Sequence, residues 1–134
     1  WLDRAGLDLI EVSGGCPASG KRGAARAKID SPEKEGYLRD LAAKVKKVVT
    51  VPVITVGGYR SVEVAEEVLR SGCADAVALS RPLICEPELP ARWASGDRSR
   101  SRCAGCQRCF GTAYKGALEC VTRTDLAFAN PEAE

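Results

Sequence analysis

Two adjacent glycines and one arginine are the residues of this chain best suited to bind an anion. Gly57 and Gly58 follow a short apolar run rich in β-branched residues, and Arg81 follows a second apolar run. Backbone N–H groups beside glycine have no β-carbon in the way, and a helix start just beyond them favours phosphate. Gly57-Gly58 alone could be a tight turn, and Arg81 alone a surface charge. Together they predict a phosphate site.

Four cysteines form the second group that could do chemistry. Three follow one another at two-residue gaps, and a fourth comes after ten more residues: Cys103, Cys106, Cys109 and Cys120. The first three match the run that wraps a 4Fe–4S iron–sulfur cluster, and four thiolates also suit a tetrahedral zinc site. A reduced thiol cluster without metal is a third interpretation. The other three cysteines are isolated, and Cys73 and Cys85 fit small core positions.

Apolar segments around these residues predict strands that alternate with helices. Val51–Val56 and Ala76–Leu79 are typical of buried strands, and Leu7–Val12 is a third. Ser61 is placed to cap a helix with an apolar stripe, which Gly72 ends. This alternation predicts an α/β fold with a parallel sheet and right-handed crossovers, so Gly57 and Arg81 are expected at the same edge.

A phosphate held by the loops after the last two strands is the usual cofactor anchor of a (β/α)8 TIM barrel, which needs on the order of 200 residues or more. With 134 residues, this chain is expected to be a fragment that supplies about three βα units from the C-terminal portion of such a barrel. The start at Trp1, without methionine, also favours a piece of a larger protein. Residues 1–97 are predicted to form the partial barrel, and residues 98–134 a cysteine-rich C-terminal extension.

Two connecting segments carry further expectations. Cys16–Asp30 is basic and aperiodic, which predicts either a substrate-covering lid or a solvated loop. Ser31 opens a predicted helix that runs to Val48, with its regular part starting near Tyr37 because Gly36 weakens the first turn. A short helix is predicted at 87–94.

Composition narrows the classes of function. Hydrophobic residues make up 45% of the chain and the net charge is only +2, which indicates a globular protein and no polyanion partner. Arg98, Arg100 and Arg102 form a basic linker typical of a solvated turn, so nucleic acid is not expected as a partner. No signal peptide or membrane-spanning run is visible. A cytoplasmic location, with thiols reduced or metal-bound, is therefore expected.

Read in order, these motifs resemble the C-terminal part of the old yellow enzyme family of NADH:flavin oxidoreductases. The resemblance runs from Gly6 to about Cys120. Its motifs are GLDLIEVSGG, EGYL from Glu35, VPVITVGGYRS from Val51, ADAVALSRPLICEPELPARWASGD and CAGCQRCF. It implies an FMN-binding (β/α)8 barrel, of which this chain would be the sixth strand onward.

The resemblance also implies site residues and a reaction. The positions that hold the FMN phosphate in the family fall on Gly57, Gly58, Ser80 and Arg81. The family uses NADH or NADPH to reduce the flavin, which passes hydride to an electron-poor alkene such as an enone. Groups that polarise the substrate lie on earlier strands of the family barrel. No catalytic residue is therefore named here, and the chain alone is expected to have little or no turnover.

Three further expectations stay open. The iron–sulfur branch of the family spaces its third cysteine one residue further along than Cys109 and carries an additional domain, so the FMN-only type is favoured. Another phosphate-binding barrel enzyme, such as a dihydroorotate dehydrogenase-like or phosphosugar enzyme, is an alternative, as is a four-cysteine metal-binding interaction module. Exposed sheet edges predict self-association as a homo-oligomer.

Overall fold

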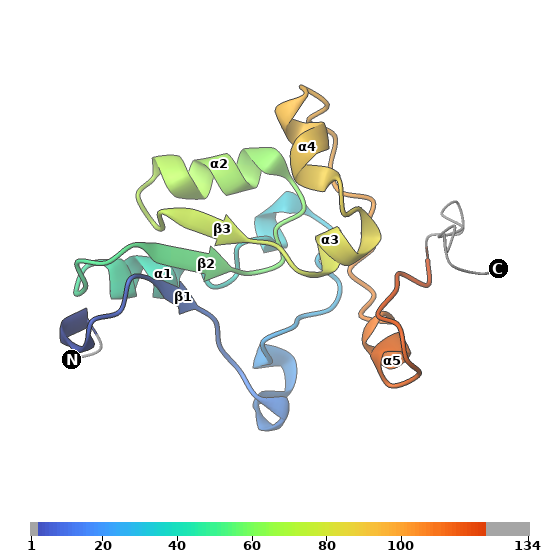
Figure 1. The fold of residues 1–134 in the computed structure, drawn as a ribbon, viewed down its shortest axis with the longest axis horizontal. Helices are drawn as coiled ribbons and strands as arrows, with labels where there is room; N and C mark the ends of the chain where they lie inside the picture. The colour runs from blue at the N-terminus through green and yellow to red at the C-terminus, as the bar shows by residue number, and fades with distance from the viewer. Residues whose placement is uncertain (1–2, 123–134) are drawn as a thin grey trace.

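Three parallel strands form the centre of the molecule (Figure 1). The computed structural model describes residues 3–122. The strands are β1 (Ile10–Val12), β2 (Val53–Val56) and β3 (Ala76–Ala78), in the spatial order β1-β2-β3. β2 begins only after Pro52, because proline has no N–H to donate to the ladder. The predicted parallel α/β class is confirmed.

Two helices connect the strands, and three short ones follow them. The helices are α1 (Arg39–Lys46), α2 (Val62–Arg70), α3 (Arg81–Cys85), α4 (Leu89–Ala94) and α5 (Phe110–Ala113). Single 3-10 segments lie at Asp3–Ala5, Pro17–Arg22 and Pro32–Lys34. None of the helices between residues 3 and 122 has the length and hydrophobicity to cross a membrane.

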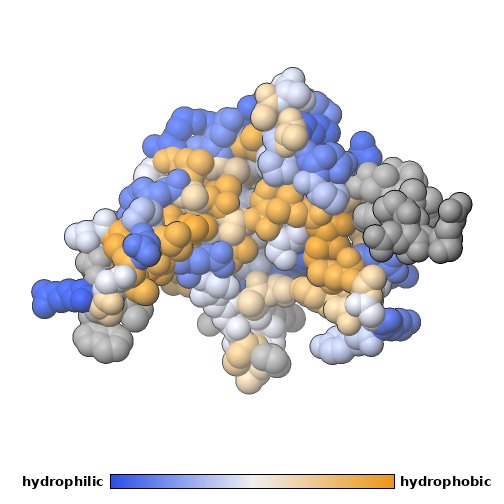
Figure 2. Space-filling view, in the orientation of Figure 1, coloured by the Kyte–Doolittle hydropathy of each residue, from blue (hydrophilic) through white to orange (hydrophobic). Residues whose placement is uncertain are grey.

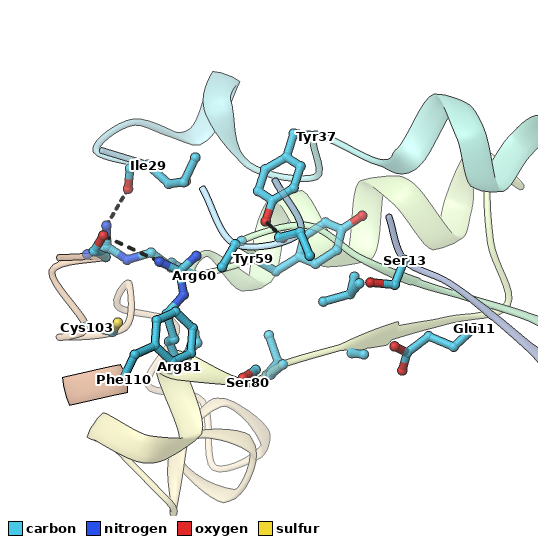
Figure 3. A pocket seen from close by; sticks show the side chains of 18 residues that line it. Glu11, Ser13, Ile29, Tyr37, Tyr59, Arg60, Ser80, Arg81, Cys103 and Phe110 are labelled. Carbon is cyan, nitrogen blue, oxygen red and sulfur yellow. Dashed lines mark hydrogen bonds between the residues drawn. The ribbon is translucent and has the colours of Figure 1, made fainter. Parts of the chain in front are cut away.

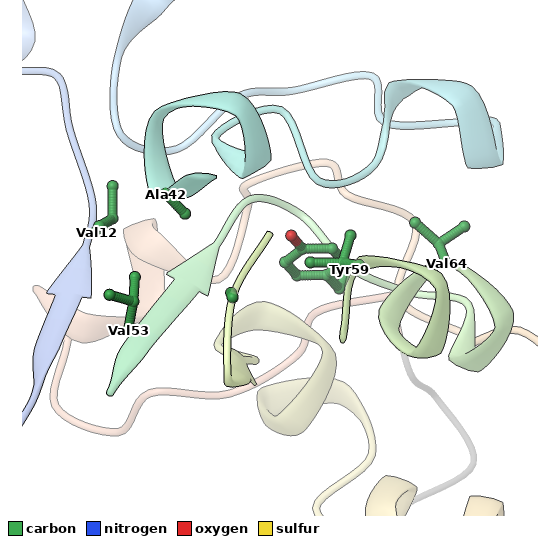
Figure 4. Packing of buried hydrophobic residues seen from close by; sticks show 7 residues of the cluster. Val12, Ala42, Val53, Tyr59 and Val64 are labelled. Carbon is green, nitrogen blue, oxygen red and sulfur yellow. The ribbon is translucent and has the colours of Figure 1, made fainter. Parts of the chain in front are cut away.

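The core lies between the sheet and the two connecting helices (Figure 4). One cluster joins Val12 and Val53 of the strands to Ala42 of α1 and to Val64 and Val68 of α2. Both helices therefore cover the same face of the sheet. Successive right-handed crossovers that advance in one direction produce this arrangement, because no reversal of strand order sends a helix to the other face.

The opposite face of the sheet is less covered. In β2, Val53 and Thr55 are buried, whereas Ile54 and Val56 point the other way and are half-buried. Hydrophobic surface remains visible over β2, β3 and α3 (Figure 2). Helices on one face only are typical of a (β/α)8 barrel, in which the helices form the outer ring. The arrangement supports the barrel, which stays a prediction.

The segment before β2 departs from the predicted helix. A 3-10 turn at Pro32–Lys34 ends before Gly36, and α1 begins only at Arg39. Gly36 has a φ of +62°, and a β-carbon there would lie 3.0 Å from the Tyr59 ring. The N–H of Tyr37 donates to the carbonyl of Gly57 at 3.3 Å, outside any helix. The close crossing of two loops therefore leaves the first turn outside the helix, and the regular part, predicted to start near Tyr37, starts at Arg39.

Ion pairs fasten the linker after α4, which is exposed at Arg98 and Arg102, as predicted for a solvated turn. Arg98 Nη2 lies 2.8 Å from a Glu66 carboxylate oxygen on α2. Arg100 Nη2 lies 2.8 Å from Glu35, and Arg102 Nε lies 3.6 Å from Glu86. The side chains of Glu35 and Glu86 are completely buried. The linker is thus fastened to the α/β core through carboxylates from distant parts of the sequence.

Candidate functional site

A cavity of about 240 Å³ opens at the carboxyl-terminal edge of the sheet (Figure 3). Every strand contributes to its wall near its carboxyl end: Glu11 and Ser13, Val56 and Gly58, and 78–81. Parallel α/β proteins bind their ligands at this edge, where the loops after the strands meet. The cavity is therefore the candidate site.

Three of the four predicted phosphate-binding residues share this cavity. Gly58 lines it after the end of β2, and Ser80 and Arg81 line it after the end of β3. Gly57 instead lies against another loop, where an added β-carbon would be 2.9 Å from the backbone nitrogen of Tyr37. Glycine at position 57 is explained by this crossing of two backbones, whereas Gly58 combines a φ of +75° with a place in the wall.

The start of α2 does not offer the free amides that the sequence predicted. The N–H groups of Arg60 and Ser61 both donate to Glu35 Oε2, at 2.8 and 2.9 Å. Ser61 Oγ donates to the other Glu35 oxygen at 2.9 Å, so this side chain does not cap its own helix as predicted. The protein's own carboxylate occupies the helix start. Within the described part of the chain, the amides of Gly58 and Tyr59 have no hydrogen-bond acceptor.

Two arginines lie together at one end of the cavity. Arg81 and Arg60 are each only 9% exposed. Arg81 Nη1 donates to the carbonyl of Gly105 at 3.5 Å, and Arg60 donates to the carbonyls of Ile29 and Ser101 at 2.5 and 3.4 Å. Between residues 3 and 122, neither forms an ion pair with an acidic side chain.

The arginine end of the cavity is therefore electropositive. Burial, together with the charges of Arg100 and Arg81, lowers the pKa of Arg60. The acidic residue in the wall, Glu11, lies with Ser13 at the opposite end (Figure 3). A buried positive charge without a counter-ion is costly, so this end is suited to an anion. Sequence reasoning missed Arg60, although its position directly after the glycine turn was a usable signal.

The segment predicted to be a lid contributes to the cavity wall. Ala24, Ala25 and Ile29 belong to its wall. The Tyr37 hydroxyl donates to the carbonyl of Ala24 at 2.7 Å, and Gln107 Nε2 donates to the carbonyl of Ala25 at 2.6 Å. The segment is thus fastened from both sides. Its action as a lid stays a prediction.

The four clustered cysteines line a second, very small cavity of about 10 Å³ beside Arg81. Their predicted proximity is correct. Among the described residues, however, no group of three or more His, Cys, Asp or Glu side chains is arranged to hold a metal ion. The predicted iron–sulfur or zinc site is therefore not supported.

Cys85 is not isolated, contrary to the sequence prediction. It is a core residue, as predicted, with only 3% of its surface exposed. Burial and a hydrogen bond with Cys120 raise the pKa of Cys85 to about 12. Cys103 belongs to the walls of both cavities, so the cysteine segment adjoins the arginine end of the candidate site.

The fold and the site define a parallel α/β protein with a cavity, lined by two buried arginines, at the carboxyl edge of its sheet. The sequence profile of the NADH:flavin oxidoreductase / NADH oxidase family matches residues 20–99, more than half of the chain. The chain belongs to this family, so the resemblance seen in the sequence is confirmed. The family implies a flavin cofactor and NADH, and small-molecule substrates.

Individual relatives are oxidoreductases of much greater length. NADH oxidase from Thermoanaerobacter brockii is 37% identical over 114 residues, which cover 82% of this chain and 17% of that protein. Cinnamate reductase from Clostridium sporogenes is 35% identical over 81 residues, which cover 59% of this chain and 12% of that protein. The solved structure of 6-hydroxypseudooxynicotine amine oxidase from Pseudomonas geniculata N1 superposes with a TM-score of 0.58 at 28% identity, over 67% of this chain and 14% of that one.

Proposed function

We propose that this chain forms the FMN phosphate-binding part of an NAD(P)H-dependent oxidoreductase. The observation that carries the proposal is the buried Arg81, which lines one cavity with Gly58 and Ser80 and has no acidic partner among the described residues. A guanidinium and unpaired amides are the groups that bind a phosphate dianion. Gly57 holds the turn in place through its packing against the loop of Tyr37.

The residues present fit the FMN phosphate. The cavity is smaller than the roughly 300–1,000 Å³ typical of sites for drug-sized ligands, so it accommodates part of such a cofactor. When bound, FMN supplies the hydride-transfer chemistry. The chain's own share is to bind the phosphate at its arginine end and to cover the site with the segments around Ala24 and Phe110.

The proposed substrate is an electron-poor alkene, with NADH or NADPH as the reductant. The proposal rests on the family and on relatives such as the NADH oxidase and the cinnamate reductase. We assign no catalytic residue within this chain. The (β/α)8 barrel, the cytoplasmic location and the homo-oligomer belong to the same proposal.

The test is the flavin content and redox behaviour of the intact protein that contains residues 1–134. We expect it to purify with FMN, to lose its flavin absorbance when NADH is added without oxygen, and to recover it when an enone is then added. A colourless protein that takes up no FMN would contradict the proposal and favour another phosphate-binding enzyme. Flavin absorbance that returns with oxygen but not with any enone would contradict only the alkene substrate.

A further inference from the structure

Arg60 is a buried, charged residue of the cavity wall that the family resemblance did not assign. We infer that it is a second arginine of the phosphate site, which places its charge beside that of Arg81. The inference rests on the proposed function and deepens it. Its argument depends on three features: the contacts of Arg60, the charge balance around it and the segments that it joins.

The contacts of Arg60 leave its charge without a counter-ion. In the described part of the chain, its terminal nitrogens donate only to the carbonyl oxygens of Ile29 and Ser101. Its Nε is buried and has no hydrogen-bond partner among the described residues. Carbonyl oxygens carry partial charges, so they satisfy hydrogen bonds without neutralising a guanidinium. An arginine that is more than nine-tenths buried in this state is costly unless an anion is nearby.

The charge balance points the same way. Three guanidinium groups gather here, since the charges of Arg81 and Arg100 both act on Arg60. The one carboxylate of the group, Glu35, is already bound by Arg100 and by two backbone amides. Two positive charges thus remain, which matches the charge of about −1.5 to −2 on a phosphate monoester near pH 7. Figure 3 shows Arg60 and Arg81 converging at the same end of the cavity.

Arg60 also joins the predicted lid segment to the linker. Its side chain reaches Ile29 of the lid segment and Ser101 of the linker. Its carbonyl oxygen accepts a hydrogen bond from the Ser101 N–H at 2.7 Å. Arg81 holds the neighbouring Gly105 in the same way. Arg60 is therefore a positioning residue as well as a charge, and the two roles predict different outcomes for a charge-removing variant.

The experiment compares FMN with riboflavin, which is the same flavin without the phosphate. Dissociation constants for both are measured on the intact protein and on Arg60→Gln, Arg60→Lys and Arg98→Gln variants. Arg98 is a matched control because it is paired with Glu63 and Glu66 away from the cavity. We expect Arg60→Gln to weaken FMN binding at least tenfold, with riboflavin changed less than twofold. Arg60→Lys should recover most of the loss, and Arg98→Gln should bind both flavins as the parent does.

Three results would overturn the inference. If Arg60→Gln weakens the binding of FMN and of riboflavin equally, Arg60 has a structural role only. If it weakens the binding of neither flavin, Arg60 has no role. If Arg98→Gln weakens FMN binding as much as Arg60→Gln does, the effect is a general effect of charge. If Arg60→Gln fails to fold, Arg60→Met takes its place, because methionine keeps the apolar stem of the side chain. Its effect on FMN binding is likewise compared with its effect on riboflavin binding. A parent protein that binds riboflavin as tightly as FMN would instead refute the proposed phosphate site itself.

Discussion

The arginines of the linker and the arginines of the cavity differ in the partners that they find. Arg98, Arg100 and Arg102 each lie within 4 Å of a glutamate carboxylate, and they fasten the linker to the core. Arg60 and Arg81 are as buried as many core residues, but within residues 3–122 their side chains donate hydrogen bonds to carbonyl oxygens only. The same side chain is structural where a carboxylate pairs with it, and among the described residues it is left without such a partner at the proposed phosphate site.

The largest expected effect is on stability, from removing the charge of Glu86, the buried carboxylate that pairs with Arg92 and with Arg102 of the linker. Glu86 is completely buried and accepts hydrogen bonds from Arg92 Nη2 at 3.1 Å, Ser101 Oγ at 2.9 Å and the Arg102 N–H at 2.6 Å. A Glu86→Gln variant leaves the Arg92 guanidinium without its buried partner, and we expect a loss of about 3 kcal/mol in the free energy of unfolding. Denaturant titration measures it, with exposed Glu67→Gln as the control. Equal stability of Glu86→Gln and the parent would remove the contrast between the two groups.

Removal of the cavity arginine should act on binding more than on stability. In an Arg81→Ala variant, a charge-assisted contact to phosphate is lost, worth about 1.5–3 kcal/mol, so FMN affinity should fall roughly tenfold to a hundredfold. Riboflavin affinity should change little. The measurement is flavin fluorescence titration, with Arg98→Ala beside it. Unchanged FMN affinity in Arg81→Ala would place the phosphate elsewhere.

A substitution at Gly57 distinguishes a role in packing from direct contact with the ligand. A Gly57→Ala variant brings a β-carbon to 2.9 Å from the Tyr37 backbone, and we expect a loss of roughly 1–3 kcal/mol in unfolding free energy from this overpacking. The ratio of riboflavin to FMN dissociation constants should stay the same. Gly111→Ala is a useful comparison, since Gly111 has no positive φ and a β-carbon there meets nothing within 4 Å. A changed ratio in Gly57→Ala would assign this residue to the phosphate site directly.

The smallest expected effect is a dependence of the unfolding free energy on pH, caused by Glu86 and its ion pairs. Burial raises the pKa of Glu86, but hydrogen bonds from the Arg102 N–H and Ser101 and the charge of Arg92 outweigh it, so the pKa is lowered overall. Glu86 therefore stabilises the fold above its unfolded pKa of about 4.3, and this contribution disappears as the pH falls through the lower folded value. Unfolding free energy should fall less steeply in Glu86→Gln between neutral and acid pH. Parallel curves for the two proteins would refute this.

Local patterns were sufficient for the alternating strands and helices. The apolar run ending at Val56 and the stripe ending at Gly72 depend on neighbours in sequence, and both elements form where predicted. The shared edge of Gly58 and Arg81 follows from parallel strands and right-handed crossovers. These features need no knowledge of distant contacts, which is why the cavity could be located from the sequence.

Pairings between distant segments could not be read from the sequence. Glu35 binds the start of α2 across about 25 residues, and nothing in its own neighbourhood predicts that it occupies the amides assigned to phosphate. The partner of each linker arginine is equally remote. The spacing of the cysteines predicted their proximity, but whether their side chains are arranged to hold a metal ion depends on the folded chain.

The most direct test of the phosphate site is a crystal structure of the intact protein with FMN bound. We predict that the phosphate lies at the arginine end of the cavity and accepts hydrogen bonds from Arg81, the Ser80 hydroxyl and the Gly58 amide. A phosphate bound away from this cavity, with Arg81 still bonded only to the Gly105 carbonyl, would contradict the account.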